Sequence, residues 1–258
     1  MADSYSDLQG KVVAVTGGAR GIGAEFVAEF QGIGARVAAI DINSPEGGKS
    51  AAEKFYQTDL TNEAALVATF DQIAKDFGRI DVLVNNAMFH DPANYLETSL
   101  EMWNMTLAVN LTAPFLAIRT VLPGMIARKS GSIINIGTVN AKMMIGSDAY
   151  SVSKGGLHAL TRTVSTRFGE HGVRCNTIVP GTVATPAWQE RIDRNPAIFN
   201  EIKKWYPLGR VGKPSDIAAA AIFLASERSS WITGIELPVD GGLLAGFNPM
   251  YKLVEGSD

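Results

Sequence analysis

Residues 16–23 read Thr16-Gly17-Gly18-Ala19-Arg20-Gly21-Ile22-Gly23, and this glycine-rich stretch decides the fold. It directly follows an apolar run typical of a strand and opens a stretch with helical periodicity. Glycines allow a tight turn with positive φ and let the backbone approach a diphosphate. The helix start then offers unpaired N–H groups and the positive end of its dipole. The order strand, glycines, helix therefore predicts a dinucleotide-binding turn. The residues expected to form it are Gly17, Arg20, Gly21, Ile22 and Gly23.

Short apolar runs alternate with helical patterns along the rest of the chain. Candidate strands are residues 11–16, 36–40, 54–58, 80–85, 131–137, 173–179 and 234–239. Candidate helices are residues 21–32, 62–77, 100–127, 150–170 and 214–225. This alternation predicts an α/β fold, a single-domain, Rossmann-type, doubly wound parallel sheet of about seven strands with helices on both faces. We expect this one domain to cover residues 1–258, with 186–206 as an inserted substrate lid.

Composition excludes several classes of function. The 258 residues are 46% hydrophobic and 19% charged, with a net charge of −3 and no basic block, so we expect no nucleic-acid partner. The N-terminal residues lack a signal-peptide pattern, and no continuous apolar run reaches about 18 residues, so we expect a cytoplasmic protein without a membrane partner. The single cysteine, Cys175, lies in an apolar run and is expected to be structural. The histidines His90, His158 and His171 show no metal-ligand spacing, so no metal is expected.

Asp41 ends the second candidate strand and indicates which dinucleotide binds. A carboxylate there can accept hydrogen bonds from both adenosine ribose hydroxyls and repels a 2′-phosphate, which favours NAD over NADP. Arg20 in the glycine turn is the opposing signal, because a basic side chain could hold a 2′-phosphate. We expect Asp41 to outweigh Arg20, since its charge would lie directly against that phosphate.

Tyr150 and Lys154 are four residues apart in a helical pattern, so their side chains share one helix face. A tyrosine that acts as a base needs its pKa lowered from about 10 toward neutrality. A nearby ammonium in a partly dry site has an effect of that order. The spacing alone is common, and it gains weight from the dinucleotide turn upstream.

These features, in this order, resemble the short-chain dehydrogenase/reductase family. The glycine spacing is T-G-x-x-x-G-x-G rather than G-x-G-x-x-G, and Asn85-Asn86-Ala87 and residues 180–185 (Pro-Gly-Thr-Val-Ala-Thr) match two further family patterns. The resemblance implies that Tyr150 is the general acid/base and that Lys154 lowers its pKa and binds the nicotinamide ribose. Asn110 would hold a water that relays protons to Lys154; the alternative is a satisfied polar group in an apolar helix.

The resemblance also implies contacts with the cofactor. Asp59 and Leu60 would meet the adenine, and Asn86 and Ala87 the adenosine ribose. The loop after the sixth strand would hold the nicotinamide end and the diphosphate. Its expected contacts are Pro180, Gly181, Val183 and Thr185. Met88 stands where the family has glycine, which puts the shape of the neighbouring pocket in doubt.

Thr138 falls on the family's catalytic serine position, although it precedes Tyr150 by one residue fewer than is usual. Threonine keeps the hydroxyl donor but adds a methyl group and stiffens χ1. We expect Thr138 to polarise the carbonyl oxygen. Asn140 or Ser147 is the alternative donor, and an inactive site is the third possibility.

Substrate specificity is expected to lie in residues 88–94, 140–148 and 186–206. The substrate contacts predicted are Met88, Thr138, Asn140, Met144 and Trp188. Their character favours a bulky, largely apolar secondary alcohol or ketone, oxidised or reduced by an NAD-dependent alcohol dehydrogenase/carbonyl reductase. By resemblance a homotetramer is expected, with a dimer as the alternative. The alternative function is a non-catalytic NAD-binding sensor or scaffold, against which the Tyr150–Lys154 pair argues.

Overall fold

The computed structural model describes residues 2–90 and 93–256, and in these residues seven parallel strands form one sheet of order β3-β2-β1-β4-β5-β6-β7. The strands are β1 (Val12–Thr16), β2 (Arg36–Asp41), β3 (Lys54–Gln57), β4 (Val82–Asn85), β5 (Gly131–Ile136), β6 (Val173–Pro180) and β7 (Glu236–Val239). The strand order reverses between β1 and β4. In open parallel sheets, ligands bind at the carboxyl ends of the strands beside such a reversal.

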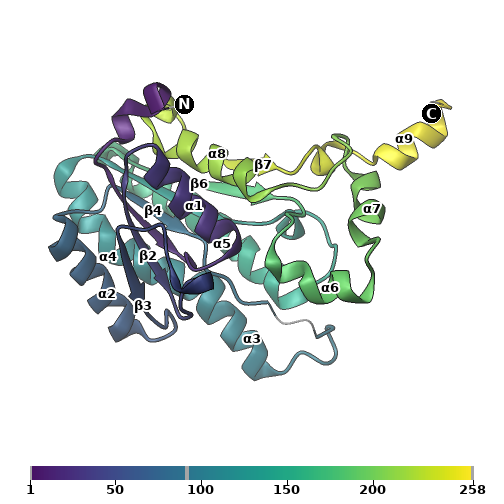
Figure 1. Cartoon of the computed structure of the whole chain (residues 1–258), viewed down its shortest axis with the longest axis horizontal. Helices are drawn as coiled ribbons and strands as arrows, with labels where there is room; N and C mark the ends of the chain where they lie inside the picture. The colour runs from purple at the N-terminus through teal and green to yellow at the C-terminus, as the bar shows by residue number, and fades with distance from the viewer. Residues whose placement is uncertain (1, 91–92, 257–258) are drawn as a thin grey trace.

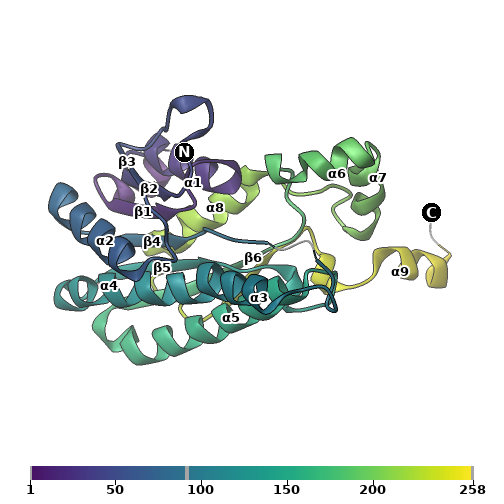
Figure 2. The same cartoon turned by 90° about the horizontal axis from the view of Figure 1, so that it is seen from below.

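Helices cover both faces of the sheet (Figure 2). They are α1 (Gly21–Gly32), α2 (Glu63–Phe77), α3 (Leu100–Leu107), α4 (Ala113–Arg128), α5 (Asp148–Phe168), α6 (Gln189–Arg194), α7 (Ile198–Ile202), α8 (Pro214–Ala225) and α9 (Asn248–Glu255). One apolar cluster joins α1 and α8 to the sheet through Phe26 and Phe30. A second joins α2, α4 and α5 to the opposite face through Phe70 and Met125. The doubly wound α/β sheet expected from the sequence is therefore confirmed.

The helix expected over residues 100–127 is two helices joined by a π-helical turn, Ala108–Thr112. Such turns carry one extra residue per turn and often occur at functional sites. The stretch Leu100–Arg128 as a whole is long and apolar enough to span a membrane, which a search for continuous apolar runs misses. Half of its most apolar window is buried in the fold, as in the core helix of a globular domain.

Residues 186–206 contain only short helical pieces. The turn Pro186–Trp188 is followed by α6, α7 and the turn Lys203–Trp205. Beyond the last strand, α9 extends away from the sheet (Figure 1). Its apolar side chains are exposed, among them Met250 at 62% and Leu253 at 85%.

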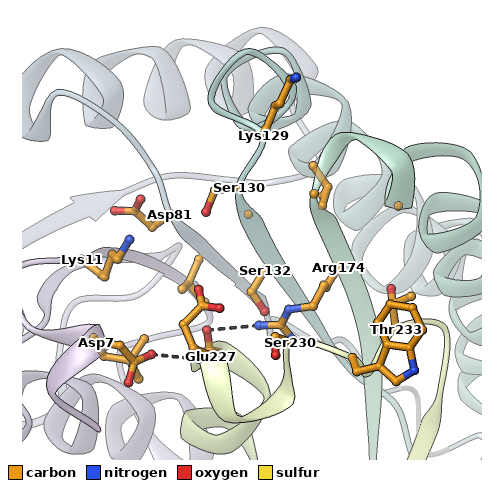
Figure 3. Close-up of a pocket in the computed structure, with 18 residues that line it drawn as sticks. Asp7, Lys11, Asp81, Lys129, Ser130, Ser132, Arg174, Glu227, Ser230 and Thr233 are labelled. Atoms are coloured by element: carbon orange, nitrogen blue, oxygen red, sulfur yellow. Dashed lines mark hydrogen bonds between the residues drawn. The ribbon is translucent and has the colours of Figure 1, made fainter.

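A cavity of about 530 Å³ opens at the amino ends of β1, β4, β5 and β6 (Figure 3). Arg174 in this cavity donates to the carbonyl oxygens of Leu224 (2.8 Å) and Ala225 (3.3 Å), at the end of α8. Asp7 accepts from the backbone N–H of Glu227 at 2.8 Å (Figure 3). These polar groups stabilise the end of α8 and the N-terminal segment, at the edge of the sheet opposite to the carboxyl ends of the strands.

Candidate active site

The glycine turn after β1 is packed too closely for side chains. Gly17 has φ of +66°, and a Cβ on it would lie 2.7 Å from the Cα of Ala87. A Cβ on Gly23 would lie 1.8 Å from the carbonyl oxygen of Gly17. Both positions therefore require glycine, and the backbone at the start of α1 is left bare for a phosphate group to approach.

Thr16 and Asn86 hold this turn against the end of β4. The Thr16 hydroxyl accepts from the backbone N–H groups of Asn86 (3.0 Å) and Ala87 (3.1 Å). The Asn86 side chain donates to the carbonyl oxygens of Thr16 (3.1 Å) and Gly17 (3.0 Å). Residues 86 and 87 thus lie beside the glycine turn, where the sequence predicted a cofactor contact. The role of the Thr16 hydroxyl in holding the glycine turn against β4 was not predicted from the sequence.

Asp41 lies at the end of β2 with its carboxylate against the glycine turn. Its Oδ2 accepts from the backbone N–H of Ala19 at 3.0 Å, and its Oδ1 from that of Asn43 at 3.0 Å. Arg20, the N-cap residue that precedes α1, has an exposed side chain. A buried negative charge therefore lies beside the turn, while the competing positive charge extends into solvent.

The loop after β6 approaches the same turn from the other side. A Cβ on Gly21 would lie 3.7 Å from the Cβ of Thr185, which brings Thr185 to the start of α1. Val183 forms an isolated parallel bridge with Gly212. The hydrogen bonds of this bridge run from the N–H of Ala184 to the carbonyl oxygen of Gly212 and from the N–H of Gly212 to the carbonyl oxygen of Thr182. Among the described residues, the N–H and C=O groups of Val183 form no backbone hydrogen bond, so they could meet a ligand.

For the remaining predicted cofactor contacts, the structure shows the local surroundings of each residue. Pro180 ends β6, and the N–H of Gly181 donates to the carbonyl oxygen of Val239 at 3.3 Å. Asp59 is exposed and accepts from the hydroxyl of Thr61 at 2.7 Å. Leu60 is buried in the apolar cluster under α2, so its side chain contributes to the core. Ile22 is half-buried and packs against the cluster under α1.

Tyr150 and Lys154 share the face of α5 that points toward the end of β5. The amine of Lys154 lies 5.7 Å from the centroid of the Tyr150 ring. It donates to the carbonyl oxygen of Ile136 at 2.8 Å, and Lys154 is only 1% exposed. Ile136 ends β5 two residues before Thr138, so strand and helix bring the three predicted catalytic residues together.

Burial dominates the electrostatics of this pair. It raises the pKa of the Tyr150 phenol to about 12, an effect partly offset by a hydrogen bond with Thr138. It also lowers the pKa of the Lys154 amine to about 7. Burial therefore outweighs the contact that lowers the pKa of Tyr150, and the lowering of this pKa by Lys154 stays a prediction. Both groups are removed from water, so both favour their neutral forms.

The Thr138 hydroxyl contacts Asn140 as well as Tyr150. It accepts from the backbone N–H of Asn140 at 3.2 Å and donates to its side-chain oxygen at 3.3 Å. These are long hydrogen bonds, which a substrate oxygen can displace. The Asn140 amide donates to the carbonyl oxygen of Gly146 at 3.0 Å. Thr138 is therefore better placed than Asn140 to donate to a substrate.

Asn110 lies in the π-helical turn and is fully buried. Its side-chain oxygen accepts from the N–H of Phe89 at 2.8 Å, and its amide donates to the carbonyl oxygen of Phe89 at 2.9 Å and to the hydroxyl of Ser153 at 3.1 Å. The side chain is thus a satisfied polar group that fixes residue 89. A relay water near Asn110 stays a prediction.

His90 and Ser147 lie beside Tyr150, a contact that the sequence did not reveal. The imidazole and phenol rings meet edge to face, with centroids 5.7 Å apart. Nε2 of His90 and Oγ of Ser147 are 2.5 Å apart. Both residues belong to segments predicted to contact substrate, but only the fold joins them.

The other predicted substrate residues differ in exposure and packing. Met88 and Met144 are exposed at 50% and 65%. Trp188 packs against Phe199, with ring centroids 5.4 Å apart. Residues 91 and 92 of the first predicted segment lie outside the described residues.

Comparisons with known proteins show the family to which this chain belongs. A family model described as enoyl-(acyl carrier protein) reductase matches residues 17–244. An oxidoreductase of Schizosaccharomyces pombe, described as uncharacterised, is 42% identical over 94% of this chain and 93% of its own. A solved oxidoreductase of Burkholderia thailandensis, described as a member of the short-chain dehydrogenase/reductase family, has a TM-score of 0.88 at 38% identity and covers 97% of this chain and 99% of its own. The chain belongs to the short-chain dehydrogenase/reductase family.

Two further relatives of this short-chain dehydrogenase/reductase have named activities. The D-threitol dehydrogenase of Mycolicibacterium smegmatis is 37% identical over 91% of this chain and 93% of its own. The solved aldohexose dehydrogenase of Thermoplasma acidophilum has a TM-score of 0.88 at 34% identity and covers 94% of this chain and 97% of its own. This family member is accordingly an oxidoreductase acting on CH–OH groups with a nicotinamide cofactor.

Proposed function

We propose that this chain is an NAD-dependent dehydrogenase that oxidises a secondary alcohol to a ketone and catalyses the reverse reduction. The observation that carries the proposal is the convergence of Thr138, Tyr150 and Lys154 at the carboxyl end of β5, on the same edge of the sheet as the cofactor turn that follows β1. When bound, the oxidised nicotinamide supplies the acceptor for the hydride. The residues of this chain bind the alcohol, orient it and move its proton.

NAD is favoured over NADP by the Asp41 carboxylate. This side chain is 9% exposed and ends β2, beside the N–H of Ala19. A 2′-phosphate there would meet a negative charge in a partly dry environment, where repulsion is strong. Arg20 is exposed and can offset only part of that repulsion.

In the proposed reaction, the substrate hydroxyl lies between Thr138 and Tyr150. Thr138 donates a hydrogen bond to its oxygen, and Tyr150 removes its proton. Lys154 then stabilises the phenolate by its nearby positive charge. In the reverse direction, Tyr150 returns the proton to the ketone oxygen.

The substrate that we propose is a bulky secondary alcohol with an apolar part. Met144 and Trp188 supply apolar surface in the two segments expected to face it. We propose residues 186–206 as the lid that excludes water. D-Threitol and aldohexoses, which give two relatives their names, are polyhydroxy compounds, so polar groups on the substrate are part of the proposal.

We also propose a cytoplasmic homotetramer. Exposed apolar side chains on α3, α4 and α5 support self-association of these helices. They include Leu100, Phe115 and Val152. The exposed apolar side chains of α9 support a further contact with a neighbouring subunit.

The test is NADH formation, followed at 340 nm, with secondary alcohols offered together with either NAD or NADP. We expect turnover with NAD that Tyr150→Phe lowers by at least about 100-fold, since it removes the proton-transfer group. NAD binding without turnover of any alcohol in a broad panel would instead favour a cofactor-binding sensor. Turnover with NADP in preference to NAD would contradict the role of Asp41.

A further inference from the structure

His90 and Ser147 form a polar pair at the edge of the catalytic tyrosine. Their side-chain atoms Nε2 and Oγ are 2.5 Å apart, and the His90 ring lies edge to face against Tyr150. Ser147 caps the start of α5, three residues before Tyr150. The pair therefore borders the place where Tyr150 would meet an alcohol.

Ser147 adopts a strained backbone conformation. Its φ of 65° and ψ of 70° lie in the left-handed region, and among the described residues Lys129 is the other non-glycine residue with positive φ. The backbone N–H and the hydroxyl of Ser151 both donate to the carbonyl oxygen of Ser147 at 2.8 Å. Such strain persists mainly where a site needs it. Here it coincides with a serine hydroxyl that is presented to His90, close to the reacting group.

The pair has hydrogen-bonding capacity for a ligand. A serine hydroxyl has one donor and two acceptor positions, and the contact with His90 uses one of them. The neighbouring Gly146 is fixed by hydrogen bonds from Asn140 (3.0 Å) and Ser151 (3.2 Å) to its carbonyl oxygen. The Ser147 hydroxyl is thus held in place with positions left to bind a small polar group.

Two cations in the surrounding segments, Lys142 and Arg191, are engaged elsewhere. Lys142, in the loop that carries Ser147, forms an ion pair with Glu236. The Arg191 guanidinium lies over the Trp188 ring, 5.0 Å from its centroid. A carboxylate ligand would favour a guanidinium fork. An uncharged hydroxyl suits the imidazole–hydroxyl pair better.

We propose that His90 and Ser147 bind a second hydroxyl group, on the carbon next to the one that is oxidised, so that the substrate is a vicinal diol. The direct contact between the His90 and Tyr150 rings favours neighbouring carbons over distant ones. The inference rests on the proposed function, because Tyr150 oxidises the first hydroxyl of that diol.

Equilibrium binding tests the subsite separately from turnover. Tyr150→Phe protein saturated with NAD is titrated calorimetrically with cis-1,2-cyclohexanediol and with cyclohexanol, which lacks the second hydroxyl. We expect the diol to bind about ten-fold more tightly, as for one added hydrogen bond to a preformed site. Adding His90→Phe, which keeps a ring against Tyr150, should remove most of that difference. Adding His171→Phe, at a half-buried histidine that follows the opposite end of α5, should preserve it.

Ser147→Gly is the second variant, because glycine tolerates the left-handed conformation while removing the hydroxyl. It should also reduce the preference for the diol. If the Tyr150→Phe protein binds the diol and cyclohexanol with equal affinity, the proposed subsite is wrong. It is also wrong if His90→Phe weakens the binding of both ligands by the same factor. Failure of the wild type to form NADH would refute the proposed function, but the difference in binding between the two ligands would still decide the subsite.

Discussion

The side-chain amine of Lys154 donates a hydrogen bond of 2.8 Å to the carbonyl oxygen of Ile136, which ties the catalytic helix to the end of β5. Burial of this amine lowers its pKa to about 7, while burial raises the pKa of Tyr150 to about 12. Because the amine lies 5.7 Å from the centroid of the Tyr150 ring, we expect the two groups to titrate as one unit. When the pair has lost one of its two protons, the phenol and the amine share the proton that remains. A phenolate beside an ammonium is one form of this one-proton state, and it cannot form while both protons are bound.

The rate of alcohol oxidation should therefore rise with pH. We expect kcat/KM for oxidation to increase through an apparent pKa of about 7, and ketone reduction, which needs both protons, to fall over the same range. Lys154→Arg keeps a positive charge well above neutral pH, so its oxidation profile should shift to higher pH. Initial rates at constant ionic strength measure this, and a flat wild-type profile from about pH 6 to 9 would argue against the shared proton.

Thr138 tests the identity of the hydrogen-bond donor. Thr138→Val removes the hydroxyl at similar volume and should lower kcat by about 100-fold or more, as for loss of one oxyanion donor. Thr138→Ser keeps the donor and should stay within about ten-fold of wild type. If the valine variant keeps the wild-type kcat, another group donates, and Ser147→Gly is the next variant to examine.

Sequence reasoning located the sheet and the cofactor turn because both depend on local patterns. Continuous apolar runs gave strands within a few residues, and the packing of Gly17 and Gly23 leaves no room for other residues. The extra residue in the π-helical turn around Asn110 has no local pattern, since that turn accompanies hydrogen bonds to the distant Phe89. The role of His90 was also hidden, because its partner Ser147 is 57 positions away and becomes a neighbour only in the fold.

The pKa of Tyr150 shows a different limit of sequence reasoning. The spacing of Tyr150 and Lys154 correctly places the two on one helix face. It carries no information on burial, which raises the pKa of Tyr150, the opposite of the direction expected from the charge of Lys154.

Asp41 can be tested without disturbing the turn. Asp41→Asn keeps an oxygen for the 3.0 Å hydrogen bond from the N–H of Ala19 and removes the negative charge. We expect the NAD-to-NADP ratio of kcat/KM to fall by about 10- to 100-fold, or roughly 1.4–2.8 kcal/mol. Arg20→Gln should leave the wild-type preference for NAD intact. An unchanged ratio in Asp41→Asn would mean that other residues select the cofactor.

Glu236 gathers three basic side chains around one carboxylate. Lys142, His158 and Arg162 contact it, and its side chain is 13% exposed. Burial raises its pKa, but the hydrogen bond from Lys142 and the nearby basic groups outweigh that effect and hold its pKa below the ordinary value. Glu236 thereby joins β7 to α5 and to the loop that follows Thr138.

Glu236→Gln should destabilise the fold by about 1–2 kcal/mol near neutral pH, because it removes the counter-charge of the partly exposed Lys142 and Arg162 and the charge beside the buried His158. A carboxyl with a lowered folded-state pKa contributes stability above its unfolded pKa of 4.5, and that contribution disappears as the pH falls. Chemical unfolding should thus show a gap in unfolding free energy between wild type and variant that stays constant from about pH 7 to pH 5 and narrows as the pH falls below 4.5. A gap independent of pH would mean that the Glu236 charge does not contribute to stability.

The helix α9 should mediate self-association. Its exposed apolar residues include Tyr251 (62%), Leu253 (85%) and Val254 (71%), more apolar surface than a free helix of eight residues would stably hold in water. Leu253→Glu places a charge in that surface and should shift the molecular mass measured by light scattering to a smaller assembly. Lys252→Glu changes an exposed neighbouring residue and should leave the assembly unchanged. A wild-type monomer at micromolar concentration, or equal effects of both variants, would show that α9 does not join subunits.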